Sequence, residues 1–242
     1  MYKLTDYTTI AKKNPYKLPS SVLHCLHTLC TAIHAEPTFE FKQEIRHTKQ
    51  DVIRELNKIT ETSSFDIFLS VLNEENVAEF APDVFTILTS NSYLMKTYCN
   101  LFVKLVSLYP VFMDTFHERL QVYKDSFQTL RFGDSAEYTL FCDINKENQV
   151  RKMFTQFIVE LDKIQSSSYG KDMSIHILEY IDSLLQTPAK DIVYECIEHI
   201  SILSKYTVHH KDKIEVYCNL SPATTPGIHS KFIFTCMDIL NV

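Results

Sequence analysis

Apolar residues recur along most of the chain at the three-and-four spacing of a buried helix face. The stretch 51–72 holds two such stripes: Val52, Ile53, Leu56 and Ile59, followed by Phe65, Phe68, Leu69 and Leu72. Between them, residues 60–64 read Thr-Glu-Thr-Ser-Ser, and hydroxyl groups of this kind are suited to end one helix and cap the next. The stretch therefore predicts an antiparallel helix pair with a tight link.

The same pattern predicts further helices on both sides of this pair. We expect them at 19–34, 76–88, 93–109, 112–130, 148–164, 172–185, 189–206, 214–220 and 230–242. Asp172 is expected to cap its helix, with Ile175 on the buried side. Residues 131–147 hold Gly133 and several charges, so a loop is expected there, with at most a short helical turn at 138–141.

One of these helices, 148–164, carries the clearest stripe in the sequence. Its apolar residues follow the helical period without a miss: Val150, Met153, Phe154, Phe157, Ile158, Leu161 and Ile164. Helix pairs that recur about every forty residues are typical of HEAT-like repeats. We therefore predict an all-α fold, an α-solenoid of about five antiparallel HEAT-like helix pairs. It would occupy 19–242 as a single domain after a flexible basic arm, 1–18.

Composition narrows the function. Only three glycines occur, and neither G-x-x-x-x-G-K nor G-x-G-x-x-G is present, so a phosphate-cradling nucleotide site is not expected. The net charge of −6 excludes a general affinity of the whole surface for nucleic acid and leaves room only for local basic patches. No stretch approaches eighteen uninterrupted apolar residues, so we expect no membrane partner. Seven scattered cysteines indicate buried, reduced thiols in the cytosol or the nucleus, and we expect a cytoplasmic protein.

One cluster of residues has the character of metal ligands: His24, Cys25, His27, Cys30 and His34. On a helix, three of them could share one face, but no second pair of ligands completes a tetrahedral shell. We therefore expect no metal and no other cofactor. The sequence also lacks G-x-S-x-G and H-E-x-x-H, and an enzyme is not expected.

Four segments, in order over residues 45–242, resemble the middle domain of eukaryotic translation initiation factor 4 gamma. They are Leu56-Asn57-Lys58-Ile59-Thr60 with Ser64-Phe65-Asp66 shortly after it, 98–116 with Pro110 at a turn, 151–161, and 230–240. The first departs from the family word by Ile59 in place of leucine. The third departs by Val159 in place of glycine. The chain is thus similar to a diverged member of this family.

The resemblance implies a crescent-shaped scaffold that catalyses nothing itself. Its two ends would touch the two lobes of a DEAD-box RNA helicase of the initiation-factor-four-A type and speed its ATP cycle. Arg54, Asn57, Lys58 and Thr60 would lie near one contact edge, and Lys231 with the 221–229 loop near the other. Asn57 and Thr60 could equally serve only to terminate their helix. No tyrosine-x4-leucine-apolar peptide for the cap-binding subunit was found.

Two groups of basic residues could contact RNA phosphates or an acidic helicase surface, and the alternative for each is a solvated loop. The first is Lys146, Arg151 and Lys152, and the second is Lys205, His209, His210, Lys211 and Lys213. Other functions remain open at this point. One is a HEAT-like adaptor that binds RNA or a protein peptide along its concave face without a helicase. Another is a virus-encoded copy that diverts host translation.

Overall fold

The computed structural model describes residues 20–33, 47–60, 65–132, 137–204 and 210–241. All regular secondary structure within these ranges is helical, which confirms the all-α prediction for them. The chain divides into two compact units, Met1–Arg46 and His47–Val242. The division lies at residue 46, whereas the sequence placed residues 19–46 in one domain with the rest. The predicted arm at 1–18 lies outside the described residues.

The described part of the first unit is one helix, α2 (Ser20–Ile33), at the predicted position. Its side chains of Val22, Leu23, His24 and His27 are exposed. No helix of the described ranges is both long enough and apolar enough to cross a membrane.

The second unit holds the other helices. In chain order they are α3 (Lys49–Asn57), α4 (Phe65–Leu69), α5 (Val77–Leu88), α6 (Met95–Leu108), α7 (Val111–Ser126), the 3-10 turn η2 (Phe127–Thr129), α8 (Tyr138–Gln165), α9 (Tyr169–Leu184), α10 (Lys190–Leu203), α11 (Lys211–Cys218) and α12 (Ser230–Leu240). Local chemistry sets several of their ends. Thr48 and Asp51 form a reciprocal capping box that starts α3, and Pro110 occupies the N-cap of α7.

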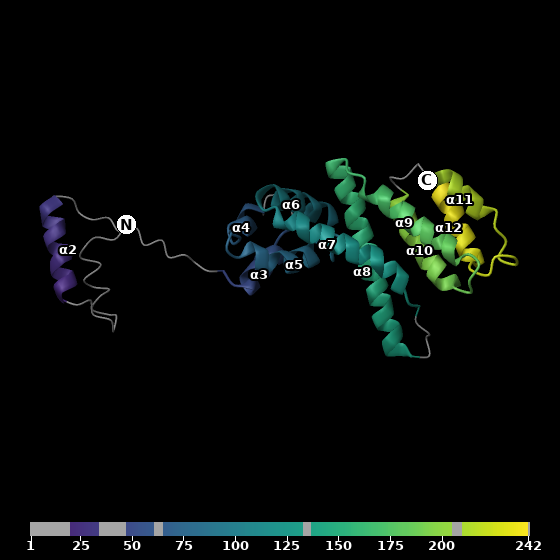
Figure 1. The fold of residues 1–242 in the computed structure, drawn as a ribbon, viewed down its shortest axis with the longest axis horizontal. Coiled ribbons are helices and arrows are strands. Elements are labelled where there is room, and N and C mark those ends of the chain that lie inside the picture. The colour runs from purple at the N-terminus through teal and green to yellow at the C-terminus, as the bar shows by residue number, and fades with distance from the viewer. Residues whose placement is uncertain (1–19, 34–46, 61–64, 133–136, 205–209, 242) are drawn as a thin grey trace. The chain divides into compact units, whose positions relative to one another are not determined.

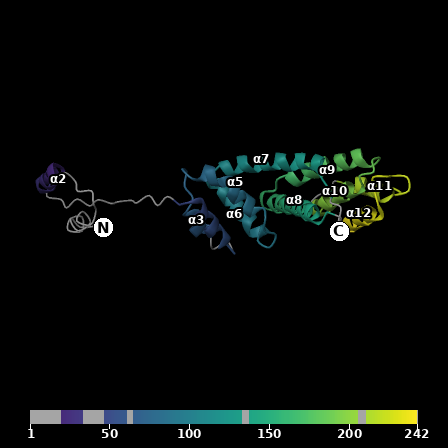
Figure 2. The same ribbon diagram turned by 90° about the horizontal axis from the view of Figure 1, so that it is seen from below.

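Helices of the second unit pack on neighbours two positions away in the chain. One series runs α3, α5, α7, and the other runs α6, α8, α10, α12. Sequential contacts join the two series: α5 packs on α6, α6 on α7, α8 on α9, α9 on α10, and α11 on α12. Figures 1 and 2 show α3 at one end of this unit and α11 and α12 at the other.

Aromatic rings from four helices fill the centre of the first half of this unit. Phe85 of α5 makes edge-to-face contacts with Phe102 of α6, Phe116 of α7 and both Phe154 and Phe157 of α8, at centroid distances of 5.5, 6.2, 6.1 and 5.5 Å. Such contacts add to the free energy gained by burying the rings, about 0.5–1.5 kcal/mol each. The rings tie α5, α6, α7 and α8 into one core.

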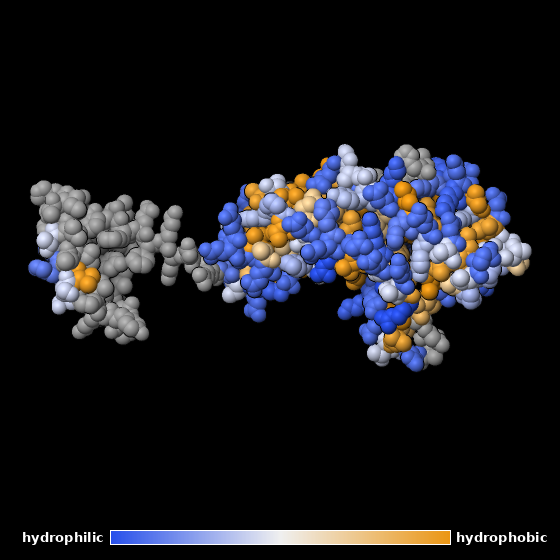
Figure 3. All heavy atoms as spheres, viewed as in Figure 1, coloured by the Kyte–Doolittle hydropathy of each residue, from blue (hydrophilic) through white to orange (hydrophobic). Residues whose placement is uncertain are grey.

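Helix α8 is longer than the sequence predicted. The loop expected at 131–147 is wrong from Tyr138 onward, because α8 already begins there. Only Ile144 and Asn148 are buried among the first thirteen residues of α8, so no apolar stripe marks this half in the sequence. Figure 1 shows this half reaching away from the neighbouring helices, and Figure 3 shows apolar side chains at its end.

Three residues expected in the core lie at the surface, and one expected cap is misplaced. Val150 and Ile164, at the two ends of the α8 stripe, are 53% and 36% exposed, since the helix outruns its neighbours. Ile175 is 39% exposed because α9 buries the face that carries Met173 and Ile177. The N-cap of α9 is Ser168, and Asp172 lies within the first turn.

Candidate functional site

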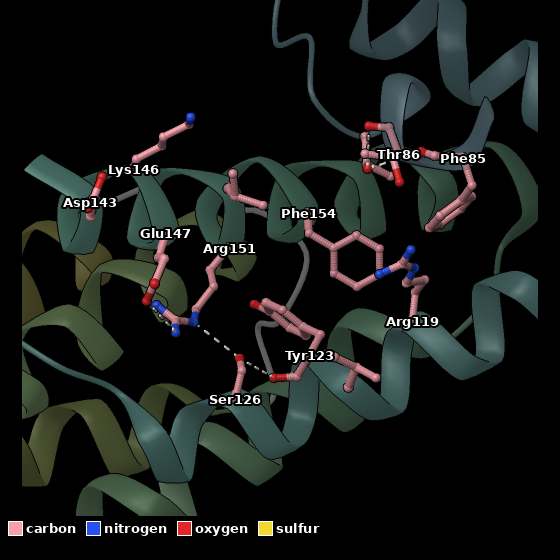
Figure 4. Close-up of a pocket in the computed structure, with 13 residues that line it drawn as sticks. Phe85, Thr86, Arg119, Tyr123, Ser126, Asp143, Lys146, Glu147, Arg151 and Phe154 are labelled. Atoms are coloured by element: carbon pink, nitrogen blue, oxygen red, sulfur yellow. Dashed lines mark hydrogen bonds and ion pairs between the residues drawn. The ribbon is translucent and has the colours of Figure 1, made fainter. Parts of the chain in front are cut away.

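An open groove of about 590 Å³ lies between α7 and α8 and reaches α5 at one end. Phe85 and Thr86 of α5 close that end, and Figure 4 shows the side chains that line the rest. The helix-to-helix contact beside the groove is made by the rings of Tyr123 and Phe154, whose centroids are 4.9 Å apart. The groove therefore has an aromatic floor.

Apolar side chains on both walls of the groove face solvent. Val122 on α7 is 60% exposed and Val150 on α8 is 53% exposed, although both line the groove. The floor differs, because Phe85, Tyr123 and Phe154 are each less than 10% exposed. The walls thus offer apolar surface that the fold of the second unit does not itself use.

The charged residues of the groove fall into two groups. Glu147 accepts two hydrogen bonds from Nη2 of Arg131, at 2.9 and 3.1 Å, and Arg151 donates to Asn148 and, at 3.2 Å, to Oγ of Ser126. Glu147 and Arg151 are therefore already engaged in hydrogen bonds within the protein. Arg119, Asp143 and Lys146 also line the groove, and none of them forms an ion pair with a described residue. The groove therefore offers two unneutralised cations and one carboxylate.

A buried polar network lies behind the groove, where α7, α8 and α10 meet. Oγ1 of Thr155 is 2.7 Å from Nδ1 of His199 and also shares a short hydrogen bond with Tyr123, whose hydroxyl is 3.3 Å from the same ring nitrogen. On the other side of the ring, Nε2 of His199 lies 3.9 Å from a carboxylate oxygen of Glu195. That oxygen is 3.2 Å from Nζ of Lys152.

Burial sets the protonation of this network. Burial, together with the smaller effect of the positive charges of Lys152 and Arg151, lowers the pKa of His199 to about 3. The imidazole is therefore neutral at pH 7. Burial also raises the pKa of the Glu195 carboxyl, against the opposing charge of Lys152. Burial alone would lower the pKa of Lys152. The hydrogen bonds and negative charges of Glu198 and Glu195 outweigh this effect, so the pKa of Lys152 is raised overall.

The order Thr155, His199, Glu195 has the outline of a nucleophile, base and acid. Thr155 and His199 are 0% exposed, however, and Glu195 is 7% exposed. A substrate has no path to a hydroxyl enclosed on all sides. The network therefore acts in packing: it fixes how α7, α8 and α10 sit against each other.

The residues predicted to bind a helicase lie at two places in the second unit. Arg54, Asn57, Lys58 and Thr60 are all exposed around the C-terminal end of α3. Arg54 pairs with Asp51 at 2.8 Å, and Lys58 pairs with Glu55 at 2.7 Å. The two cations of these pairs are exposed, and such local ion pairs at a surface are weak, so Arg54 and Lys58 remain accessible to a partner. Asn57 is the last residue of α3 and Thr60 lies just beyond it, as expected for residues that end a helix.

The other predicted edge consists of the start of α12 and the loop before it. Lys231 is the second residue of α12 and is exposed. In the 221–229 loop, Gly227 packs against the end of α9: its N–H donates to the carbonyl oxygen of Leu185 at 2.9 Å. A Cβ at this position would lie 2.4 Å from the carbonyl oxygen of Leu184, so only glycine fits without a backbone shift.

The first predicted basic patch is only partly available to a partner. Lys146 is exposed, but the Arg151 side chain is 13% exposed and hydrogen-bonded to α7 and α8. Lys152 is turned away toward α10, where it contacts Glu195 and Glu198. The three residues are close in sequence, yet their side chains lie on different sides of α8.

The second predicted patch is similarly divided. Lys205 and His209 lie outside the described residues. Lys213 forms an ion pair with Asp182 of α9, and Lys211 is exposed at the first position of α11. His210 lies at the N-cap of α11.

Three of the cysteines of the second unit are buried in its core. Cys99, Cys196 and Cys236 are free and buried, and burial raises the pKa of each thiol. Cys142 is free and exposed. Among the described residues, no group of three or more histidine, cysteine or acidic side chains is arranged to hold a metal ion. His34 and the side chains of Cys25 and Cys30 lie outside what the structure describes.

The groove was not predicted, although part of its signal was present. The sequence predicts Lys146 and Arg151 as part of a basic patch and places Asp143 in a loop, and no motif in it marks Arg119 or Val122 of α7 as site residues. The spacing of Glu195 and His199, one helical turn apart, was a signal for the buried network.

No protein-family profile, curated protein sequence or solved structure matches this chain.

Proposed function

We propose that this chain is a non-catalytic scaffold of translation initiation, which binds and stimulates a DEAD-box RNA helicase of the initiation-factor-four-A type in the cytoplasm. The proposal begins from the resemblance of residues 45–242 to the middle domain of initiation factor 4 gamma. In it, the second unit is an α-solenoid of HEAT-like helix pairs, and the helicase lobes are held by its two ends.

The stacking of the helices supports the solenoid part of the proposal. Each of the series α3, α5, α7 and α6, α8, α10, α12 joins helices two positions apart in the chain. This is the pattern expected when helix pairs stack so that each repeat contacts its neighbours. The aromatic cluster centred on Phe85 belongs to the same pattern, because it joins helices of consecutive pairs.

The observation that carries the helicase proposal is the position of the two predicted contact edges. Asn57 and Lys58 are exposed at α3, Lys231 is exposed at α12, and Figure 1 shows these helices at opposite ends of the second unit. A scaffold that holds two separate lobes needs two separate exposed sites. Direct RNA contact is the smaller part of the proposal, and the residue best placed for it is Lys211, which is exposed at the start of α11.

The test is the RNA-dependent ATPase rate of a four-A-type helicase with and without the full chain. We expect stimulation, and we expect the double variant Asn57→Trp/Lys58→Glu to weaken helicase binding by roughly tenfold, about 1.4 kcal/mol. Lys96→Glu is the matched control, since Lys96 is exposed on α6, a helix that forms part of neither predicted edge. Equal stimulation by the double variant and the control would remove α3 from the contact. Absence of both stimulation and binding at low salt would overturn the proposal.

A further inference from the structure

The groove between α7 and α8 leaves apolar surface exposed on two walls at once. Val122 and Val150, at 60% and 53% exposure, line the same groove from different helices. Their side chains stand above the closed floor of Tyr123 and Phe154. Facing apolar walls over an aromatic floor are the usual surface for the apolar stripe of a helical peptide.

The charges of the groove favour an acidic partner. Arg119 and Lys146 line it and form no ion pair with a described residue, whereas Glu147 is neutralised by Arg131. Against these two cations stands one unpaired carboxylate, Asp143. This excess of positive charge occurs in a chain whose net charge is −6. An acidic segment would be drawn to this groove more than to the surface as a whole.

The two cations lie at different levels along the groove. Lys146 precedes Phe154 on α8 by eight residues, a rise of about 12 Å. Arg119 extends into the groove on the Phe154 side (Figure 4). This rise along α8 corresponds to about two turns of a helix, so we expect acidic residues about seven or eight positions apart on a bound helix to reach both cations.

We propose that this groove binds an amphipathic helix of a partner protein, with its apolar stripe on Val122, Val150 and the aromatic floor. Acidic side chains two turns apart on that helix pair with Arg119 and Lys146. Single-stranded RNA fits less well. The rings of the floor are each less than 10% exposed, so they offer no open face for the base stacking on which single-strand binding depends. The inference does not rest on the helicase proposal, whose contact edges are α3 and α12.

The first experiment selects from a displayed library of helical peptides on the full chain, with counter-selection on the variant Val122→Asp/Val150→Asp. Both valines are largely exposed, so this variant keeps its fold, which circular dichroism checks. We expect enriched peptides that bind the unchanged chain at least tenfold more tightly than the variant. They should carry apolar residues at i, i+3 or i+4 and acidic residues seven or eight apart.

The second experiment exchanges the charges. Arg119→Glu/Lys146→Glu should weaken an enriched peptide at least tenfold, and a copy of that peptide with its two acids changed to lysine should recover the loss. Lys171→Glu, an exposed position on α9, is the control and should change nothing. The proposal would be overturned by the absence of any groove-dependent peptide, by enriched peptides without the acidic pair, or by groove-dependent binding of a single-stranded oligouridine. Concentration-dependent dimerisation that Val122→Asp/Val150→Asp abolishes would also overturn it, in favour of self-association.

Discussion

The two halves of α8 belong to one helix but have different surroundings. In the second half, Phe154, Thr155, Phe157, Ile158, Val159 and Leu161 are buried. In the first half, through Val150, only Ile144 and Asn148 are buried, and Tyr138 is 75% exposed. Substitutions in the second half are therefore expected to disturb core packing. The first half is helical with few such contacts, so its exposed residues are available to bind a partner.

The largest effect is expected when an aromatic ring is removed from the second half of α8. Phe157→Ala should lower the free energy of unfolding by about 3–5 kcal/mol, since Phe157 is fully buried in the aromatic cluster. Urea denaturation measures this loss. Val150→Ala, on the exposed half, is the control and should change stability by less than about 0.5 kcal/mol. Similar losses for both variants would contradict the division of α8.

A second test measures how stability depends on pH, because Thr155 in the second half of α8 contacts the buried His199. The pKa of His199 is lowered to about 3 in the folded state, against an ordinary value near 6.5. Between these pH values the unfolded chain binds a proton that the folded chain does not. Stability due to this group is thus fully present above pH 6.5 and falls by about 1.4 kcal/mol per pH unit as pH drops toward 3.

His199→Gln removes this titration, while Glu195, whose raised carboxyl pKa has the opposite effect on stability, remains in both proteins. Denaturation at pH 7.0 and 4.5 should therefore show a steeper loss for the unchanged chain, by roughly 2.7 kcal/mol. Parallel pH profiles for the two proteins would show that His199 is not held neutral by its surroundings.

A third test compares a buried and an exposed residue within the first half of α8. Ile144 is 3% exposed there, so Ile144→Ala should cost about 2 kcal/mol, the lower end of the range for buried aliphatic residues. Leu140→Ser, one turn earlier at a side chain that is 42% exposed, should cost less than about 0.5 kcal/mol. If both changes are neutral in thermal melts, the first half is held more loosely than the burial of Ile144 indicates.

The same contrast explains what the sequence could predict. Helices with a continuous apolar stripe were predicted to within a few residues, as for α5 and α10, because the stripe records their packing. The first half of α8 has no stripe, since Ile144 and Asn148 alone are buried there. Val150 and Ile164 continued the period of the packed half, but periodicity does not reveal where the neighbouring helices stop. Pairings across helices, such as Thr155 with His199, depend on tertiary contacts that one sequence does not display.

The proposed contact edges can be tested most directly by amide hydrogen exchange on the full chain with and without a saturating four-A-type helicase. If the two ends bind the helicase, amide exchange should be slower around Asn57 and Lys58 at the end of α3 and around Lys231 at the start of α12. Exchange along α7 and the first half of α8 should be unchanged. Protection confined to the groove between α7 and α8, or no protection anywhere, would contradict the claim that the two ends of this unit hold a helicase.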